Sequence, residues 1–185
     1  MQQKDVWNFI FELGQLRRIK HEGWRIIGID NLESVADHSL RAAQIGFILA
    51  KMEKYENPLE IVAILVFHDM GEARIGDIHK VANRYVQSDE ERAVKDQTEK
   101  LGDIGKDIFA LWRHGGTKAD IIAKDADLLE QAAIAKEHIE KGHKFAQNWI
   151  NNISKKLQTG SAKKLLSALE KTSFNDWWHG LKKID

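Results

Sequence analysis

The stretch Leu65-Val66-Phe67-His68-Asp69-Met70-Gly71-Glu72-Ala73-Arg74-Ile75-Gly76-Asp77 decides how the rest of the chain is interpreted. An apolar run ends in an adjacent imidazole and carboxylate, and two more carboxylates follow at Glu72 and Asp77. Burying so many ionisable groups is costly unless they are paired or bind a cation. His68 and Asp69 suit a divalent cation, and adjacent helix positions lie about 100° apart, so both can reach one ion at a helix end. Two ligands do not complete a site, so this hypothesis requires further buried ligands elsewhere in the chain.

The bulk composition favours one globular domain over residues 1–185. The chain is 43% hydrophobic, and its length is sufficient for a substantial core. Its 28 basic and 28 acidic residues give a formal net charge of zero, without the basic excess typical of proteins that bind polymeric nucleic acid. The chain has no cysteine, which excludes disulfides, zinc-thiolate sites and thiol nucleophiles. Any metal must therefore bind to His, Asp and Glu.

No segment has the features of a membrane span or a secretion signal. Uncharged apolar runs stay well below the length of about 18 residues that a spanning helix needs. The amino terminus, Met1-Gln2-Gln3-Lys4-Asp5, lacks a basic region followed by a long apolar run. We therefore expect a cytoplasmic protein that does not enter a membrane.

The spacing of apolar residues predicts a protein that is nearly all α-helical. Apolar side chains recur at helical spacing, and the chain has one proline and no alternating strand pattern. Asn57-Pro58 is a strong helix start, and residues 34–37 and 117–120 have the spacing of capping boxes. We expect Trp177-Trp178 to pack the tail onto the body, and no linker divides the chain. The predicted helices cover residues 5–19, 34–54, 58–69, 89–101, 105–114, 118–141, 144–157 and 161–171.

Three of these predicted helices offer ligands at positions that look buried. They carry His38, the pair His68-Asp69, and one of Asp125 and Asp127. Both aspartates lie inside an apolar run, where a carboxylate does not serve packing. Each ligand has a plainer interpretation, as a histidine satisfied within the core or as an aspartate that forms a salt bridge.

The order His38, His68-Asp69 and Asp127 resembles the motif of the HD-domain phosphohydrolase superfamily, in which a histidine, a His-Asp pair and a later aspartate surround one metal. The resemblance covers about residues 6–140, and residues 143–185 add nothing to it. Three segments are similar to the branch that holds the 5′-deoxynucleotidases: Glu33-Ser34-Val35-Ala36-Asp37-His38-Ser39, His68-Asp69-Met70-Gly71-Glu72 with Gly76-Asp77, and Lys124-Asp125-Ala126-Asp127.

The resemblance implies one divalent ion bound by two nitrogen and two oxygen ligands. Asp127 fits the family's spacing, whereas Asp125 lies about 200° away on the helix, so both cannot face one ion. Asp37 either orients an imidazole or is a solvated carboxylate at the helix start. The metal stays open among cobalt, manganese, zinc, nickel, iron and magnesium. The ligands implied are His38, His68, Asp69 and Asp127.

The resemblance also assigns roles in catalysis and sugar binding. A divalent ion lowers the pKa of bound water from about 15.7 toward 7 and neutralises charge on a phosphoryl oxygen. Glu72, one turn beyond His68, matches the family's catalytic acid, which protonates the leaving 5′-oxygen. Asp77 matches a position that contacts the sugar hydroxyls. The plainer alternatives are a surface carboxylate for Glu72 and helix capping for Asp77.

Trp24, Arg17 and Arg18, which precede His38 in the chain, resemble other substrate contacts of the family. Trp24 is similar to an aromatic residue that packs near the sugar and helps to exclude a 2′-hydroxyl, with core packing as its alternative. Arg17 and Arg18 are similar to an arginine placed against the substrate phosphate, where a guanidinium can bind two oxygens. The loop between Arg18 and Trp24 lacks the proline typical of the family, so the choice between the two arginines stays open.

These residues together imply a metal-dependent phosphohydrolase of small nucleotides, a 5′-deoxynucleotidase that converts deoxyribonucleoside 5′-monophosphates to deoxynucleoside and phosphate. The alternatives are another HD-type phosphodiesterase or pyrophosphohydrolase, or a non-catalytic protein that a metal stabilises. Glu72 and Asp77 at these spacings favour the first interpretation. We also expect a homo-oligomer, because the family is usually dimeric or larger and the helices after residue 143 have apolar faces that the core does not fully use.

Overall fold

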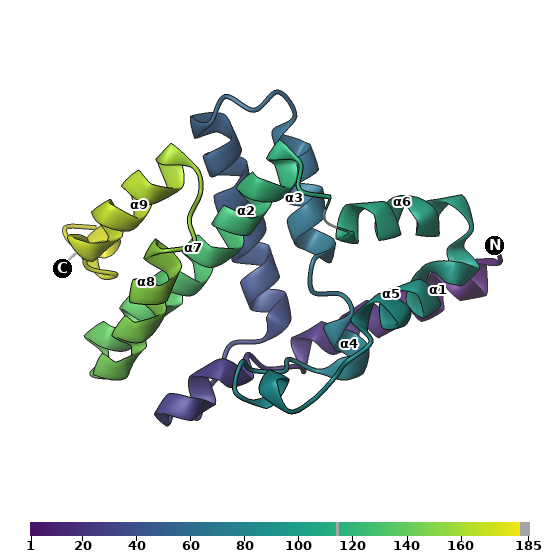
Figure 1. Ribbon diagram of the computed structural model, residues 1–185, viewed down its shortest axis with the longest axis horizontal. Helices are drawn as coiled ribbons and strands as arrows, with labels where there is room; N and C mark the ends of the chain where they lie inside the picture. The colour runs from purple at the N-terminus through teal and green to yellow at the C-terminus, as the bar shows by residue number, and fades with distance from the viewer. Residues whose placement is uncertain (114, 182–185) are drawn as a thin grey trace.

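The computed structural model describes residues 1–113 and 115–181 (Figure 1). These residues form helices and no strand, so the predicted all-α fold is confirmed for them. None of the described helices is both long and apolar enough to cross a membrane. The α-helices are α1 Gln3–Leu13, α2 Val35–Met52, α3 Pro58–Phe67, α4 Glu72–Ile75, α5 Glu90–Thr98, α6 Asp103–Trp112, α7 Lys118–Glu140, α8 Gln147–Ser154 and α9 Gly160–Glu170.

Helices α2, α3 and α7 form the centre of the molecule, where α2 packs against both of the others (Figure 1). The predicted capping boxes begin α2 and α7, with Ser34 and Thr117 as the N-caps. Gly46 allows the close approach of α2 to α3, because a Cβ at this position would lie 2.3 Å from Leu65 Cδ1. Two of the expected ligand segments lie on α2 and α7, and the third, His68-Asp69, directly follows α3.

The apolar side chains form two clusters. The larger joins α2, α3 and α7 to α8 and α9, and Leu65 is fully buried in it. The smaller joins Phe9 of α1 and Met70 to residues of α5 and α6. Burying one such side chain stabilises the fold by about 1.5–3 kcal/mol. His68 and Asp69 therefore lie at the junction between the two clusters, where the backbone on either side is fixed by packing.

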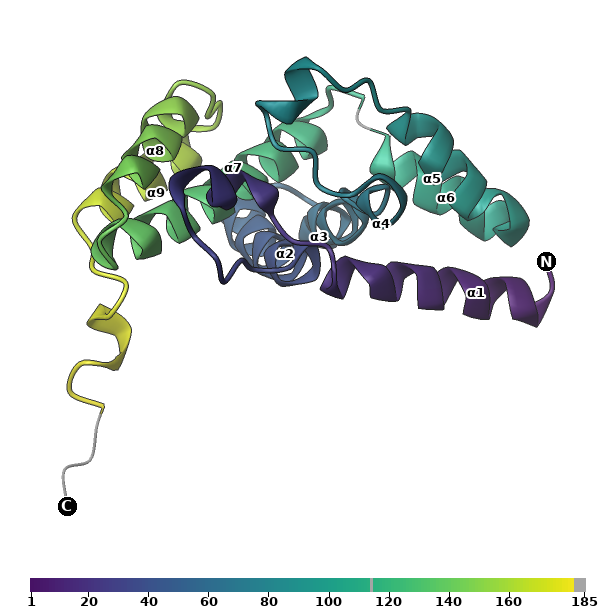
Figure 2. The same ribbon diagram turned by 90° about the horizontal axis from the view of Figure 1, so that it is seen from below.

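The carboxyl-terminal helices differ from the expectation that they leave apolar faces unused. Ile150 and Ile153 of α8 and Leu166 of α9 are buried in the larger cluster against α7. The predicted packing of the tail is wrong for Trp177, which is 76% exposed. Figure 2 shows the tail running away from the body. The apolar residues of α8 and α9 thus complete the core of the chain itself.

Some helix ends also differ from the predicted ones. The helix expected over residues 5–19 ends at Leu13, and a 3-10 helix over Gly14–Arg17 follows it. A glycine at the C-cap explains the early end, since glycine is a weak helix former. The helix expected over 105–114 ends at Trp112, and residue 114 lies outside the described residues.

Candidate metal centre

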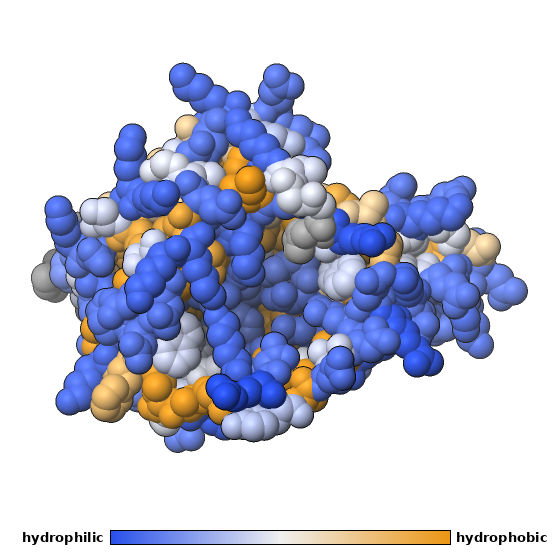
Figure 3. Space-filling view, viewed as in Figure 1, coloured by the Kyte–Doolittle hydropathy of each residue, from blue (hydrophilic) through white to orange (hydrophobic). Residues whose placement is uncertain are grey.

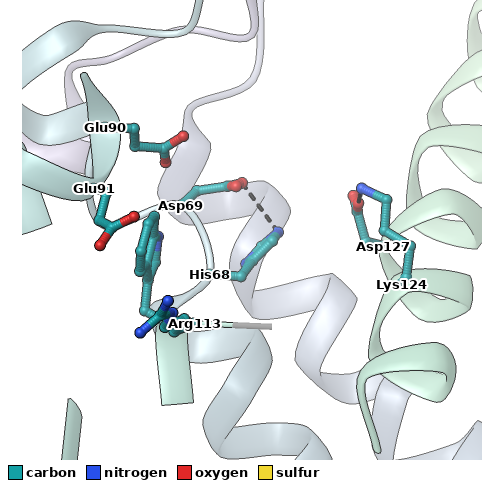
Figure 4. A pocket seen from close by; sticks show the side chains of 8 residues that line it. His68, Asp69, Glu90, Glu91, Arg113, Lys124 and Asp127 are labelled. Carbon is teal, nitrogen blue, oxygen red and sulfur yellow. Dashed lines mark hydrogen bonds and ion pairs between the residues drawn. The ribbon is translucent and has the colours of Figure 1, made fainter. Parts of the chain in front are cut away.

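Four side chains from three helical segments meet at one point. His38 lies in the first turn of α2, His68 and Asp69 follow α3, and Asp127 lies on α7. His38 Nε2 lies 3.3 Å from His68 Nε2, 3.3 Å from Asp127 Oδ1 and 3.7 Å from Asp69 Oδ2. Asp69 Oδ2 lies 3.0 Å from His68 Nε2 (Figure 4). The structure therefore brings together all four residues that the sequence offers as ligands.

The orientation of the two imidazoles fits a cation. His68 Nδ1 lies 2.8 Å from the carbonyl oxygen of Leu65, and His38 Nδ1 lies 2.5 Å from Glu130 Oε2. In the neutral rings, with each Nδ1–H donated to its oxygen, both Nε2 atoms carry lone pairs, and neither can donate to the other. Two nitrogen lone pairs that face each other beside two carboxylates are a donor set for a divalent ion. The ligand atoms of His38, His68 and Asp127 all lie within 4.8 Å of one another, which also fits one ion.

The electrostatics of the cluster favour positive charge. Burial would lower the pKa of His38, but hydrogen bonds to Asp127 and Glu130 outweigh burial and raise this pKa to about 11, so Nε2 holds a proton unless a metal ion takes its place. Burial opposes ionisation of Asp127 in the same way, yet the hydrogen bond to His38 and the charge of Lys124 hold its pKa well below the usual range. The carboxylates thus remain ionised and attract a cation.

Helix geometry separates the two neighbouring aspartates as expected. Asp125 is fully buried and accepts hydrogen bonds from the backbone N–H groups of Gln158, at 3.0 Å, and Thr159, at 2.7 Å. Asp127 points to the centre instead, where Lys124 Nζ donates to it at 2.6 Å. Asp125 therefore ties the start of α9 to α7, while the role of Asp127 as a metal ligand stays a prediction.

Glu72 lies at the start of α4 and has an unusual carboxyl group. Its Oε2 is buried and has no hydrogen-bond partner among the described residues. Burial, followed by repulsion from Asp69 and Asp77, raises the pKa of Glu72 to about 9. The group is consequently a neutral acid near pH 7, which is the state that a proton donor requires.

Asp77 has the capping role that was its plainer interpretation, and it also lines a cavity. Its Oδ2 accepts a hydrogen bond of 2.7 Å from the backbone N–H of Glu22, the first residue of a 3-10 helix over Glu22–Ile27. Asp77 thus caps a helix in a distant segment. It also lines the larger of two cavities beside the centre, together with Glu72.

Two cavities lie beside the centre, and Lys124 lines both of them. The smaller, of about 370 Å³, is lined by His68, Asp69 and Asp127 and by residues of α5 and α6 (Figure 4). The larger, of about 940 Å³, extends from Glu72 to α8. Figure 3 shows a recess in the middle of the viewed face, bordered mainly by hydrophilic side chains. The metal centre is therefore accessible from a site large enough for a small molecule.

Trp24 lies on the wall of the larger cavity, whereas the two arginines do not. Trp24 is 3% exposed, and its ring stacks on Trp149 with centroids 4.7 Å apart. It therefore belongs to the core and to the cavity wall at once. Arg17 and Arg18 are exposed and line neither cavity, and Arg18 Nη1 lies 3.4 Å from the carbonyl oxygen of Gly14. Their positions do not support the expected phosphate contact, because the 3-10 helix after α1 leaves both on the surface.

Comparison with known proteins identifies the family of the chain. A family model described as HD domain matches residues 13–171. The chain belongs to the HD domain family. The match includes all of α8 and α9, so the similarity to the family extends beyond the expected limit of about residue 140.

The relatives of this HD-domain chain agree with the predicted branch. The 5′-deoxynucleotidase HDDC2 of Dictyostelium discoideum is 31% identical over 145 residues, which cover 71% of this chain and 76% of the relative. The protein of the same name from Homo sapiens is 28% identical over 176 residues, covering 90% and 85%. A solved structure of a conserved hypothetical protein from Pyrococcus furiosus has a TM-score of 0.72 at 27% identity, covering 89% and 99%. The predicted resemblance is thereby confirmed.

The sequence analysis missed Glu130, a buried residue that accepts a hydrogen bond from His38 in the HD-domain centre. Glu130 is fully buried on α7, and besides His38 it accepts hydrogen bonds from Arg41 Nε at 2.9 Å and Nη2 at 2.7 Å. Arg41 Nη1 donates to Glu137 at 2.7 Å. Asp37, the residue considered for this role, instead accepts from Ser34 at the start of α2. The sequence feature that could have indicated Glu130 is its position in an apolar run, one helical turn after Asp127.

His21 is a second residue near the HD-domain centre that the sequence analysis missed. Its ring centroid lies 4.4 Å from that of His38, and its Nδ1 lies 3.2 Å from Glu33 Oε1. A ligand atom of His21 also lies within 4.8 Å of ligand atoms of His38 and Asp69. His21 lines the larger cavity, so it adds a polar group beside the metal ligands. No sequence pattern indicated it, because a backbone contact between irregular segments, His21 N–H to the carbonyl oxygen of Glu33, holds it there.

Proposed function

We propose that this HD-domain protein is a metal-dependent 5′-deoxynucleotidase, which hydrolyses deoxyribonucleoside 5′-monophosphates to deoxynucleoside and phosphate. Relatives named 5′-deoxynucleotidase support the class of reaction. One observation carries the proposal for this chain. Glu72, whose buried Oε2 has no hydrogen-bond partner among the described residues, lines a small-molecule cavity beside a convergent His and Asp cluster.

His38, His68, Asp69 and Asp127 would hold the divalent ion. When bound, the ion supplies an activated water and neutralises charge on the phosphoryl group. Glu130 and the carbonyl oxygen of Leu65 fix the two imidazoles with their Nε2 atoms toward it. Nitrogen and oxygen ligands suit cobalt, manganese, zinc, nickel, iron and magnesium alike, so the identity of the metal is a question for measurement.

Glu72 would act on the 5′-oxygen of the nucleotide, and Asp77 would contact its sugar. Glu72, neutral near pH 7, donates its proton to the leaving 5′-oxygen. Asp77 uses Oδ2 to hold the Glu22 backbone, and its carboxylate accepts a hydrogen bond from a sugar hydroxyl. Trp24, fixed by its stack on Trp149, would be the rigid wall beside the sugar that helps to exclude a 2′-hydroxyl.

A panel of nucleotides assayed against several divalent ions tests the proposal. We expect hydrolysis of deoxyribonucleoside 5′-monophosphates in preference to ribonucleotides, with release of inorganic phosphate. Preferential cleavage of a cyclic nucleotide or a nucleoside triphosphate would favour another HD-type reaction. A protein that binds metal but turns over no nucleotide would be the non-catalytic alternative.

We also propose that the chain forms a homo-oligomer and works in the cytoplasm. Trp7 and Phe11 stack on the exposed face of α1 at 57% and 66% exposure, and Leu40 and Ile48 are exposed on α2. Exposed apolar residues of this size support a contact between copies. A chain without cysteine suits a reducing compartment. A monomer in light scattering at micromolar concentration would contradict the first proposal, and a secreted enzyme in cell fractionation would contradict the second.

A further inference from the structure

Three lysines from separate segments line the larger cavity. Lys80 follows α4, Lys124 lies on α7, and Lys156 follows α8. Lys124 also lines the smaller cavity and donates to Asp127 at 2.6 Å (Figure 4). The group of lysines therefore begins at the metal centre and extends from it along the cavity.

The position of Lys156 follows from contacts between α7 and the segment after α8. Two residues farther on, the N–H of Gln158 donates to Asp125, which is the neighbour of Lys124 in the chain. Leu157 is buried in the larger core cluster. These contacts hold the backbone of Lys156 against α7 at the level of Lys124.

The lysines keep positive charges together without a nearby acid to balance all of them. In the part of the chain that the structure describes, Lys124 pairs with Asp127, whereas no carboxylate pairs with Lys80 or Lys156. Burial lowers the pKa of Lys80, and the neighbouring charges of Lys156 and then Lys124 lower it further. Like charges held together repel one another, and a bound anion relieves this repulsion.

The acids on the same cavity do not balance the three lysines. Burial favours the neutral form of Glu72, whose pKa is raised to about 9. Asp77 remains as a charged acid on the cavity wall, and the backbone N–H of Glu22 already donates to it. The lysines therefore face the cavity as an unbalanced cationic wall beside the centre at which a phosphoryl group would bind.

We infer that Lys80, Lys124 and Lys156 form a phosphate-binding wall, and that the segment after α8 takes part in substrate binding through Lys156. The inference rests on the proposed function, whose substrate carries a phosphate dianion. Ammonium groups bind phosphate as point charges from several directions, so three lysines suit a tetrahedral anion. The wall takes the role that the sequence analysis gave to Arg17 and Arg18, which line neither cavity.

Binding of inorganic phosphate to the protein with its metal tests the wall without turnover. The double variant Lys80→Gln/Lys156→Gln should bind phosphate at least about tenfold more weakly in calorimetry, because one hydrogen bond to a charged group already contributes about this factor. Lys155→Gln is the matched control, since Lys155 is exposed and lines neither cavity. It should bind phosphate like the wild type. Lys80→Arg/Lys156→Arg, which keeps both charges, should stay within about threefold of the wild type.

Three results would overturn the inference. One is wild-type phosphate affinity in the double Gln variant, and another is an equal loss in Lys155→Gln, which would indicate a general effect of charge. The third is a loss in the double Arg variant as large as in the double Gln variant.

The tests of the wall and of the nucleotidase activity can fail separately. If the wild type binds phosphate through the lysines but hydrolyses no nucleotide, the wall stands and the proposed function fails. If the double Gln variant hydrolyses deoxynucleotides with an unchanged KM, the proposed function stands and the wall fails.

Discussion

The two sides of the cavity hold their charged groups in different ways. On the side of α2, α3 and α7, the His38 side chain is 1% exposed and bonds to Glu130, which is 0% exposed. On the side of α8, Lys156 is exposed and has no paired carboxylate among the described residues. Hydrogen bonds inside the core orient the metal-binding groups before any ligand arrives, whereas the lysines still require an anion. The first side should therefore control metal binding, and the second should control substrate affinity.

The largest effect should come from the adjacent pair on the metal side. The wild type should hold about one divalent ion per chain, and His68→Ala or Asp69→Ala should abolish both metal and activity. Each change removes a ligand and leaves the other buried groups without their cation. Elemental analysis of purified protein measures the ion directly. Wild-type metal content in His68→Ala would show that the site is misassigned.

Variants of the two aspartates of α7 separate metal binding from structural support on one helix. Asp127→Ala should lose the metal, whereas Asp125→Ala should keep it and unfold at lower temperature. Removing Asp125 leaves the N–H groups of Gln158 and Thr159 without their acceptor, at a cost of about 1–3 kcal/mol for a buried group. Metal content and thermal unfolding of both variants give the test. The reverse pattern would mean that the wrong aspartate faces the ion.

Glu130 tests whether the buried hydrogen bonds orient the metal side. Glu130→Gln keeps an acceptor for His38 but loses the charge, so metal affinity should fall by about 10–100-fold. Glu137→Gln is a matched control, because it contacts Arg41 and not His38. Calorimetric titration of the metal-free proteins measures both affinities. Equal affinity in Glu130→Gln and the wild type would remove the proposed orienting role.

The pH dependence should show the smallest effect, and it reports on Glu72. Because burial and neighbouring acids raise its pKa to about 9, Glu72 is protonated below this pH and loses its proton above it. A bound cation lowers this pKa, so kcat should fall with rising pH in a limb centred at or below about pH 9. The limb should be absent from the residual activity of Glu72→Gln. A limb that persists unchanged in this variant would belong to another group.

Sequence reasoning succeeded where one helix or one motif sets the geometry. The angle between Asp125 and Asp127 follows from helical periodicity, and the spacing of apolar residues predicted the all-α fold. The meeting of His38 with the other three ligands was predicted from the resemblance to the HD-domain family. Glu130 could not be paired with His38 in this way, because their contact depends on how α2 packs against α7. Short-range patterns do not contain that information.

The other unpredicted features arise from short irregular segments. Gly14 ends α1 early, which leaves Arg17 and Arg18 on the surface. Lys80 and Lys156 reach one cavity from connections between helices, where no periodic pattern applies. The apolar faces of α8 and α9 looked free because apolar spacing within a helix does not show which other helix covers it, and here α7 does.

Comparing two substrates on one variant tests the central claim most directly. Glu72→Ala should retain its ion and lose about 10²–10⁴ in kcat on a deoxyribonucleoside 5′-monophosphate, with little change in substrate affinity, because proton donation strengthens only in the transition state. An aryl phosphate should lose much less, since its departing oxygen hardly needs a proton. A folding defect would not separate the two substrates. Equal losses on both substrates, or wild-type rates on both, would contradict the role of Glu72 as the acid.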